Sequence, residues 1–171
     1  YGGGPEGRPD RRIAPVATLT AEVLQVRDVP TGESVGYSRG YIAERPIKVA
    51  TVAAGYADGL LRSYSPKGAV WIANETRPLL GRVSMDVCAV DITGLDVAVG
   101  DPVELFGPNR LLDDAAAAAG TISYELLTSI TPRQVWDDGA FTYFRFRSNG
   151  ELPSILSVSA GRERSVNSHT M

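Results

Sequence analysis

The segment Ile13–Val29, with the sequence IAPVATLTAEVLQVRDV, is the longest β-favouring run of the chain. Its Val, Thr and Leu residues recur with a period close to two, and the run breaks at Pro30-Thr31-Gly32. This alternation is typical of a strand with one buried face, and the Pro and Gly that follow are turn residues. The segment therefore predicts a long strand closed by a turn.

Further short β-favouring runs follow along the chain, separated by clusters of Gly, Pro, Asn or Asp. They are Ile47–Ala54, Ala69–Ala73, Leu79–Ser84, Val87–Ile92 and Val103–Phe106. Short strands at this spacing, divided by turn residues, are typical of an all-β sandwich or barrel. The predicted fold class is therefore mainly β, with sandwich and barrel both left open.

Two short helices are predicted between residues 111 and 130. In Leu111–Ala119 the acidic pair Asp113-Asp114 precedes five alanines and Gly120 follows them, which marks a helix start and stop. A second helix is expected over Thr121–Ile130, where Thr121 is a candidate N-cap. Pro132 should end it, because proline cannot continue the helical hydrogen bonds.

The chain of 171 residues is about one domain long, which is too short for a complete two-domain enzyme. Residues 1–12 are rich in Gly, Pro and charge, so we expect a linker from a missing N-terminal domain. Residues 13–136 are predicted as the β domain. Residues 137–171 are expected to form a divergent and loosely ordered tail, although the aromatic alternation in 141–146 favours one more strand.

The composition argues against several classes of function. Lys and Arg number 17 against 20 Asp and Glu, so the net charge of −3 disfavours nucleic-acid binding, and no apolar run is long enough for a membrane span. The single cysteine, Cys88, favours a reducing compartment such as the cytoplasm. No metal site is expected, because acidic residues lack ligand spacing, and the only histidine, His169, is too near the end to serve a catalytic triad.

Three segments contain residues suited to chemistry, and they read VGYS (35–38), AGYADG (54–59) and GRVSMD (81–86). In the first two, a tyrosine follows a glycine whose missing side chain lets a ligand approach. A tyrosine accepts a proton at neutral pH only where a positive charge lowers its pKa from about 10, and Arg39 and Arg82 are candidates for that charge. Tyrosines at a barrel edge with satisfied hydroxyls are the alternative interpretation.

These segments, together with GTISYELLT (120–128), resemble the C-terminal domain of alanine racemase in order from about Val16 to Ile130. The resemblance implies a pyridoxal-phosphate enzyme with an N-terminal eight-stranded α/β barrel and a mainly β C-terminal domain, assembled as a head-to-tail homodimer. It implies the interconversion of L-alanine and D-alanine, a step in D-alanine biosynthesis for peptidoglycan precursors. This chain resembles the second domain only, so the barrel domain and a second subunit would be its partners.

The resemblance also implies roles for individual residues. Tyr37 matches the tyrosine that acts as a base on the cofactor–substrate aldimine of the partner subunit, opposite a lysine of the barrel. Tyr56 matches a residue at the entrance near the small amino-acid substrate, and Met85 one whose backbone N–H contacts the substrate carboxylate. Around the access corridor the matching residues are Arg82, Ser84 and Asp86. Pro132 stands where the family often has an aromatic residue near the cofactor phosphate, so no phosphate ligand is assigned.

The chemistry of racemisation agrees with this division of roles. Inverting a stereocentre requires a proton to leave one face and arrive on the other, which suits two acid–base groups on opposite faces.

Neither Lys48, in an alternating strand pattern, nor Lys67, in a turn sequence, suits a cofactor anchor. We therefore expect the chain alone neither to bind pyridoxal phosphate covalently nor to racemise alanine. A free-standing β-barrel binding module and a racemase of serine or another small amino acid are the alternatives.

Overall fold

The computed structural model describes residues 18–130, 134–137, 142–145, 156–159 and 162–165. The chain divides into two compact units, residues 1–131 and 132–171, and each is described by itself. The predicted linker and His169 lie outside the described residues.

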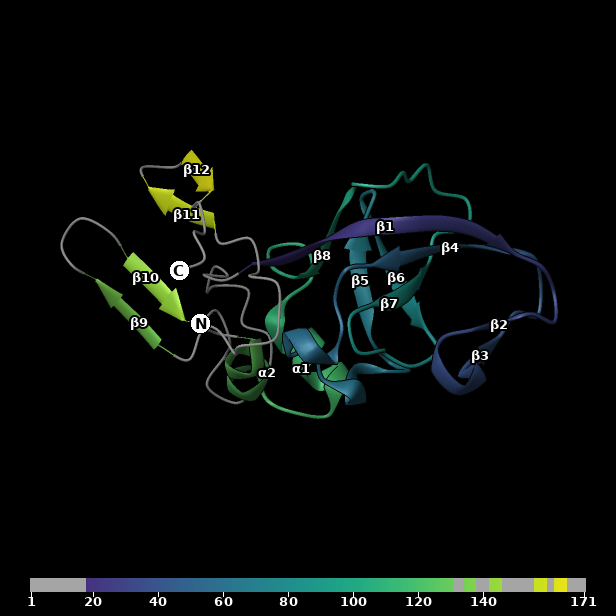
Figure 1. Cartoon of the computed structure of the whole chain (residues 1–171), viewed down its shortest axis with the longest axis horizontal. Helices are drawn as coiled ribbons and strands as arrows, with labels where there is room; N and C mark the ends of the chain where they lie inside the picture. Colours follow the sequence, from purple (N-terminus) through teal and green to yellow (C-terminus); the bar gives the residue numbers. More distant parts are fainter. Residues whose placement is uncertain (1–17, 131–133, 138–141, 146–155, 160–161, 166–171) are drawn as a thin grey trace. The chain divides into compact units, whose positions relative to one another are not determined.

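Six strands of the first unit form a closed antiparallel barrel, drawn in purple to teal in Figure 1. In their order around the barrel they are β1 (Leu19–Val29), β4 (Ile47–Val52), β7 (Cys88–Asp91), β6 (Glu75–Leu80), β5 (Ala69–Ile72) and β8 (Pro102–Phe106). The mainly β prediction is confirmed, and the structure decides in favour of a barrel over a sandwich.

The long strand β1 closes the barrel because its two halves pair with different neighbours. Its first half pairs with β8, with Thr20 opposite Glu104, and its second half pairs with β4, with Val29 opposite Ile47. The register shifts between Val23 and Gln25. Such an irregularity bends and twists a strand, which lets one strand join both edges of the sheet.

The observed strand limits differ from the predicted ones by one or two residues in β4, β5, β7 and β8, and by more in β6. We expected a strand over Leu79–Ser84, whereas β6 begins at Glu75 and ends at Leu80. A hairpin turn at Ala73 and Asn74, with φ values of 48° and 63°, starts β6 earlier. Gly81, with φ of 68°, ends the strand because its backbone leaves the extended region.

Both predicted helices are present, as α1 (Leu112–Ala119) and α2 (Ser123–Ile130). Helix α2 begins two residues later than predicted, so Ile122 and not Thr121 precedes it, and the N-cap prediction was wrong. Asp113 and Asp114 lie in the first turn of α1, and Gly120 ends it in the left-handed conformation. Helix α1 contacts α2, strand β8 and the 3₁₀ segment η3 (Arg62–Tyr64). None of the described helices has the length and apolarity of a membrane-spanning segment.

Two hydrophobic cores stabilise this unit. The large core fills the barrel and continues to the helices, with Tyr64, Leu105 and Leu126 among its fully buried members. The small core lies under a hairpin formed by β2 (Ser34–Val35) and β3 (Tyr41–Ile42), which Figure 1 shows at the end of the barrel away from the helices. Its buried members are Val29, Val35, Ala43, Ile47, Val49 and Leu80.

The second unit contains two separate hairpins. Strand β9 (Gln134–Asp137) pairs with β10 (Thr142–Arg145), and β11 (Leu156–Ser159) pairs with β12 (Arg162–Ser165). Strand β10 is the one that the aromatic alternation predicts. The domain limits at 13–136 and 137–171 stay predictions.

Candidate functional site

The three segments that the sequence analysis selected are brought together by the fold, although up to 50 positions separate them in the chain. The segment 81–86 lies in the middle. Its beginning packs against residues 35–41, and its end packs against residues 55–57. The site is therefore a set of loops at the ends of β2, β4 and β6, supported by the barrel.

The contact between the first and third segments depends on Gly81. A Cβ atom placed on this residue would lie 2.7 Å from the carbonyl oxygen of Val35. Its φ of 68° also lies in the left-handed region, which side chains disfavour. The Tyr37 loop consequently packs directly on backbone, and its position is coupled to that of Arg82.

The contact between the second and third segments is closer still. A Cβ atom on Gly55 would lie 2.1 Å from the carbonyl oxygen of Met85. The N–H groups that follow it hold the two backbones together, because Tyr56 donates to the Ser84 carbonyl at 3.0 Å and Ala57 to the Met85 carbonyl at 2.8 Å. Tyr56 and Met85 are thus placed by the same pair of backbone hydrogen bonds.

Tyr37 begins the 3₁₀ segment η1 (Tyr37–Arg39), and its side chain is 65% exposed. The next two residues, Ser38 and Arg39, have φ values of 56° and 54°. Left-handed backbone at residues other than glycine costs free energy and is retained where the surrounding structure imposes it, often at functional sites. No described group forms a hydrogen bond with the Tyr37 hydroxyl, so the phenol is available to another molecule.

Tyr56 begins the 3₁₀ segment η2 (Tyr56–Asp58) and is 40% exposed. The guanidinium carbon of Arg62 lies 5.5 Å from the centroid of its ring, which is a cation–π contact. The turn is capped by Asp58, whose carboxylate accepts a hydrogen bond from the Gly55 N–H at 2.8 Å. These contacts orient the tyrosine ring at the surface.

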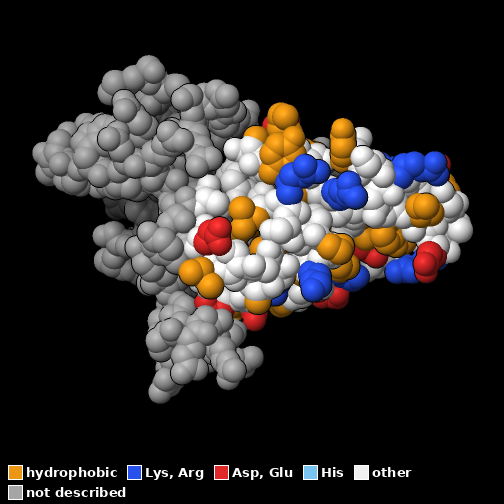
Figure 2. All heavy atoms as spheres, turned by 90° about the horizontal axis from the view of Figure 1, so that it is seen from below, with side chains coloured by type: hydrophobic (Ala, Val, Ile, Leu, Met, Phe, Trp, Pro, Cys, Tyr) orange, Lys and Arg blue, Asp and Glu red, His pale blue; other side chains and the backbone are white. Residues whose placement is uncertain are grey.

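The third segment supplies the remaining predicted residues. Met85 is 54% exposed, and among the described groups none accepts a hydrogen bond from its backbone N–H. Arg82 and Asp86 are exposed, whereas Ser84 is half-buried and donates its N–H to the Val87 carbonyl at 2.9 Å. The barrel face shown in Figure 2 carries separate hydrophobic side chains among both basic and acidic side chains.

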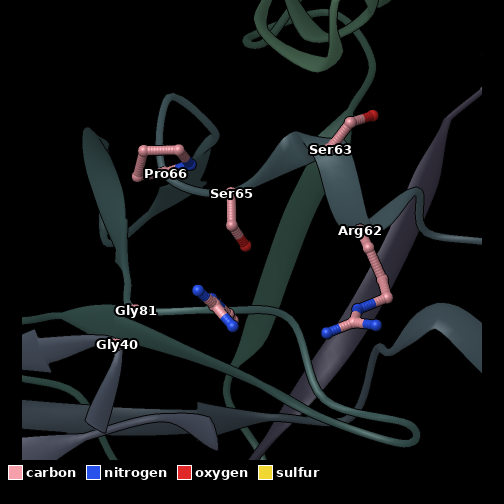
Figure 3. A pocket seen from close by; sticks show the side chains of 7 residues that line it. Gly40, Arg62, Ser63, Ser65, Pro66 and Gly81 are labelled. Carbon is pink, nitrogen blue, oxygen red and sulfur yellow. The ribbon is translucent and has the colours of Figure 1, made fainter. Parts of the chain in front are cut away.

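A pocket of about 490 Å³ adjoins these loops (Figure 3). It is lined by Gly40, Arg62, Ser63, Ser65, Pro66, Gly81 and Arg82. Of these residues, only Gly81 and Arg82 belong to a segment selected from the sequence. The contribution of residues 62–66 was missed because a turn sequence does not reveal which other loop it will face.

Two buried titratable groups lie in the core behind the site. Burial raises the pKa of the Tyr64 phenol, although Arg110 opposes this, and its hydroxyl donates to the Ala69 carbonyl. Burial, with a smaller contribution from the charge of Asp58, raises the pKa of the Cys88 thiol to about 12. Both groups therefore stay protonated at neutral pH and belong to the core.

That neither of the chain's two lysines anchors an aldehyde cofactor stays a prediction. Lys48 is half-buried in β4, and its backbone N–H donates to the Thr93 hydroxyl at 3.0 Å. Lys67 is exposed between Pro66 and Gly68. Neither belongs to the three segments. Within the part of the chain that the structure describes, no group of three or more His, Cys, Asp or Glu side chains could hold a metal ion.

Comparisons with known proteins confirm the resemblance seen in the sequence. A family model for the C-terminal domain of alanine racemase matches residues 16–135. The alanine racemase of Brucella canis is 47% identical over 129 residues, which are 74% of this chain and 33% of that protein. The chain thus spans about a third of the length of the curated relatives it matches.

Solved structures agree with the sequence comparison. The alanine racemase from Acinetobacter baumannii matches with a TM-score of 0.73 and 41% identity, over 78% of this chain and 38% of that one. The alanine racemase from Bartonella henselae, solved with covalently bound pyridoxal phosphate, matches with a TM-score of 0.71 and 39% identity, over 76% of this chain and 37% of that one. The chain belongs to the family of alanine racemase C-terminal domains.

Proposed function

We propose that the chain is the C-terminal domain of a two-domain enzyme that interconverts L-alanine and D-alanine, and that Tyr37 is one of its two bases. The observation that carries this proposal is the exposed phenol of Tyr37, presented on a strained loop with no described hydrogen-bond partner. Family membership supports the reaction class, and the cofactor in the Bartonella henselae relative supports pyridoxal phosphate as the cofactor.

The proposed mechanism divides the work between two faces of the substrate. Pyridoxal phosphate supplies an electron sink that makes the α-hydrogen of a bound amino acid acidic. The Tyr37 phenol oxygen then takes or gives the proton on one face, and a base outside the described residues serves the other face. A lysine is the expected second base, because it could also hold the cofactor.

The neighbouring residues would bind and admit the substrate. The Met85 backbone N–H, which no described group uses, is suited to a hydrogen bond with the substrate carboxylate. Tyr56, held by Arg62, would border the entrance. Arg82, Ser84 and Asp86 would surround the access corridor, where charged and polar side chains favour a zwitterionic amino acid over apolar solutes.

The position of Tyr37 also supports a partner subunit. The Tyr37 side chain is 65% exposed and neither Lys48 nor Lys67 belongs to the three segments, so the other reacting groups would lie outside this domain. We infer a homodimer in which each C-terminal domain completes the active site of the other subunit. A cytoplasmic location is consistent with the single buried thiol of Cys88.

A free-standing binding module is the second candidate, and one observation favours it. The six barrel strands form a closed ring, so the barrel itself has no open sheet edge that requires another domain. A binding module predicts a monodisperse monomer in sedimentation experiments. The racemase domain instead predicts association through the exposed Tyr37, Tyr56 and Met85 surface when the barrel domain is present.

The Tyr37→Phe variant of the full-length protein tests the catalytic proposal, because it removes only the phenol oxygen. We expect racemisation to fall by about 100-fold or more, the usual contribution of one acid–base group. Exchange of the α-hydrogen with solvent should fall more for one enantiomer than for the other, while cofactor absorbance stays unchanged. Equal turnover of both enantiomers at the unmodified rate would refute the role of Tyr37.

The substrate and the anchoring group need their own measurements. Full-length enzyme assayed on alanine and serine separates the two racemase alternatives, and we expect alanine to be preferred.

The 171-residue chain mixed with pyridoxal phosphate should form no adduct that borohydride can trap. A trapped adduct at Lys48 or Lys67 would contradict the inferred division between the two domains.

A further inference from the structure

We infer that Ser129, near the end of helix α2, is a positioning residue for substrate binding. Its hydroxyl holds the turn of residues 55–59, the Tyr56 turn, and through that turn it directs the Met85 backbone N–H. This role rests on the proposed racemase function, because Tyr56 and Met85 serve a substrate only there. The link from the helix to the turn can be measured without any substrate.

The Ser129 hydroxyl reaches a carbonyl group 70 positions away in the chain. Ser129 Oγ lies 2.8 Å from the Gly59 carbonyl oxygen and 2.7 Å from that of Leu126. A serine hydroxyl has one proton, so it cannot serve both oxygens fully. The Leu126 carbonyl lies inside helix α2, where the N–H four residues later can donate to it. No other hydrogen bond from the described residues reaches the Gly59 carbonyl, which therefore depends on Ser129.

The Gly59 carbonyl belongs to a peptide group that is held on both sides. The N–H of the same peptide group, that of Leu60, donates to the Gly55 carbonyl at 3.1 Å. Gly59 has a φ of 99°, and the wide conformational freedom of glycine leaves the direction of its carbonyl to its partners. Leu60 and Leu126 are both buried in the large core, so helix α2 and the end of this turn share one core. The hydroxyl of Ser129 thus fixes a peptide group beside a rigid support.

The other end of the Tyr56 turn directs the Met85 N–H. The Tyr56 N–H donates to the Ser84 carbonyl at 3.0 Å. That carbonyl and the Met85 N–H belong to one planar peptide group, so the direction of one sets the direction of the other. No described group accepts a hydrogen bond from the Met85 N–H, the donor proposed for the substrate carboxylate. A displaced Tyr56 turn would therefore turn this donor away from the substrate.

Loss of the Ser129 hydroxyl should release one end of the turn and leave the rest folded. Asp58 still caps the turn, and the hydrogen bond to the Ser84 carbonyl remains. Tyr37 lies in a different loop, which packs on Gly81. Substrate binding should consequently weaken while the proton transfer proposed for Tyr37 stays unchanged. A residue that served stability alone would not separate these two steps.

Steady-state kinetics of the full-length enzyme test this separation. Ser129→Ala should raise KM for both enantiomers of alanine by about fivefold, the usual contribution of one hydrogen bond, and change kcat by less than about twofold. Ser129→Thr retains a hydroxyl and should keep KM near that of the parent. Ser129→Val has the shape of the threonine variant without the hydroxyl, and it should behave like Ser129→Ala.

The matched control is Ser123→Ala, which removes another half-buried serine hydroxyl from the same helix. The Ser123 hydroxyl donates to the Asp113 carboxylate and not to the turn, so KM should stay unchanged. NMR of the isotope-labelled 171-residue chain supplies the measurement without substrate. Ser129→Ala should shift the Met85 amide signal and speed hydrogen exchange of the Leu60 amide by about fivefold, and Ser123→Ala should do neither.

Three results would overturn the role of Ser129. They are equal KM values in the threonine and valine variants, a fall in kcat as large as the rise in KM, and an unchanged Met85 signal in Ser129→Ala. None of them contradicts the racemase proposal, which is tested by Tyr37→Phe. Full activity of Tyr37→Phe would refute that proposal instead, and the NMR comparison of Ser129→Ala with Ser123→Ala would still decide whether Ser129 holds the turn.

Discussion

The barrel interior and the candidate site are held by different interactions. In the barrel, buried side chains such as Tyr64 and Leu105 contribute stability through packing. In the site, Tyr37, Tyr56 and Met85 are exposed, and the loops are joined backbone to backbone through Gly55 and Gly81. The fold therefore places the site through backbone contacts and not through packing of the site's own side chains. Those side chains therefore remain available to a ligand or partner.

Truncating one leucine in each region should give the largest contrast. Leu105, 1% exposed in β8, leaves a cavity when changed to alanine and should lower the free energy of unfolding by about 3 kcal/mol. Leu24→Ala is the matched control, because Leu24 is also on a strand but 51% exposed, and it should cost about 0.5 kcal/mol. Urea unfolding measures both. Equal losses would show that the barrel is not the stabilising region.

Removing one tyrosine hydroxyl from each region should affect stability in the barrel only. The Tyr64 hydroxyl donates to the Ala69 carbonyl at 2.5 Å, so Tyr64→Phe should cost about 1.5 kcal/mol in urea unfolding. The Tyr37 hydroxyl has no described partner, and Tyr37→Phe should leave stability unchanged. A similar loss in the Tyr37 variant would mean that its phenol serves the fold.

Alkaline pH should act on the barrel interior through Cys88. Its thiol has a pKa of about 12 in the folded chain against 9.0 for an ordinary thiol. Below pH 9 the thiol is protonated in both the folded and the unfolded chain, and the folded chain has its full stability. As pH rises from 9 towards 12 the thiol loses its proton in the unfolded chain first, which lowers the free energy of unfolding. Between pH 9 and 10, the free energy of unfolding should fall by up to about 1.4 kcal/mol.

The Cys88→Ala variant is the control for this pH dependence, because it removes the titrating group. Its unfolding free energy, measured in urea over the same pH range, should fall less steeply than that of the parent. Identical slopes would assign the alkaline loss to another group, such as Tyr64, whose pKa burial also raises.

The smallest effect is expected at the cap of the Tyr56 turn. Asp58→Ala removes the acceptor of the Gly55 N–H and should cost about 1 kcal/mol, seen as faster hydrogen exchange of that amide. Asp58→Asn retains an oxygen acceptor and should preserve most of the protection. Unchanged exchange in the alanine variant would show that the backbone bonds to Ser84 and Met85 suffice to hold the turn.

Much of the fold could be predicted because its determinants are local. Alternation in the run ending at Val29 and the acidic start and Gly120 stop of the first helix act over a few residues. The end of β6 was mispredicted because Leu79–Ser84 has strand-like composition, while the conformation of Gly81 depends on the loop that packs against it. Local preferences alone do not contain that contact.

The candidate site was predictable in part. Tyr37 and Tyr56 were selected because each follows a glycine, and both are exposed in the structure. Arg62 and Ser65 were not predicted, since their partners, the Tyr56 ring and the Val83 N–H, are identified only by spatial proximity. The roles of Tyr37, Tyr56, Met85, Arg82, Ser84 and Asp86 stay predictions.

Residue types at short spacing were enough to predict most of the barrel strands, the two helices and the family resemblance. Tertiary structure decided that β1 joins β4 to β8, that the three loops meet and that two arginines share one pocket. Those outcomes depend on pairing residues far apart in the chain. Such pairing is selected by burial and hydrogen bonding summed over the whole barrel.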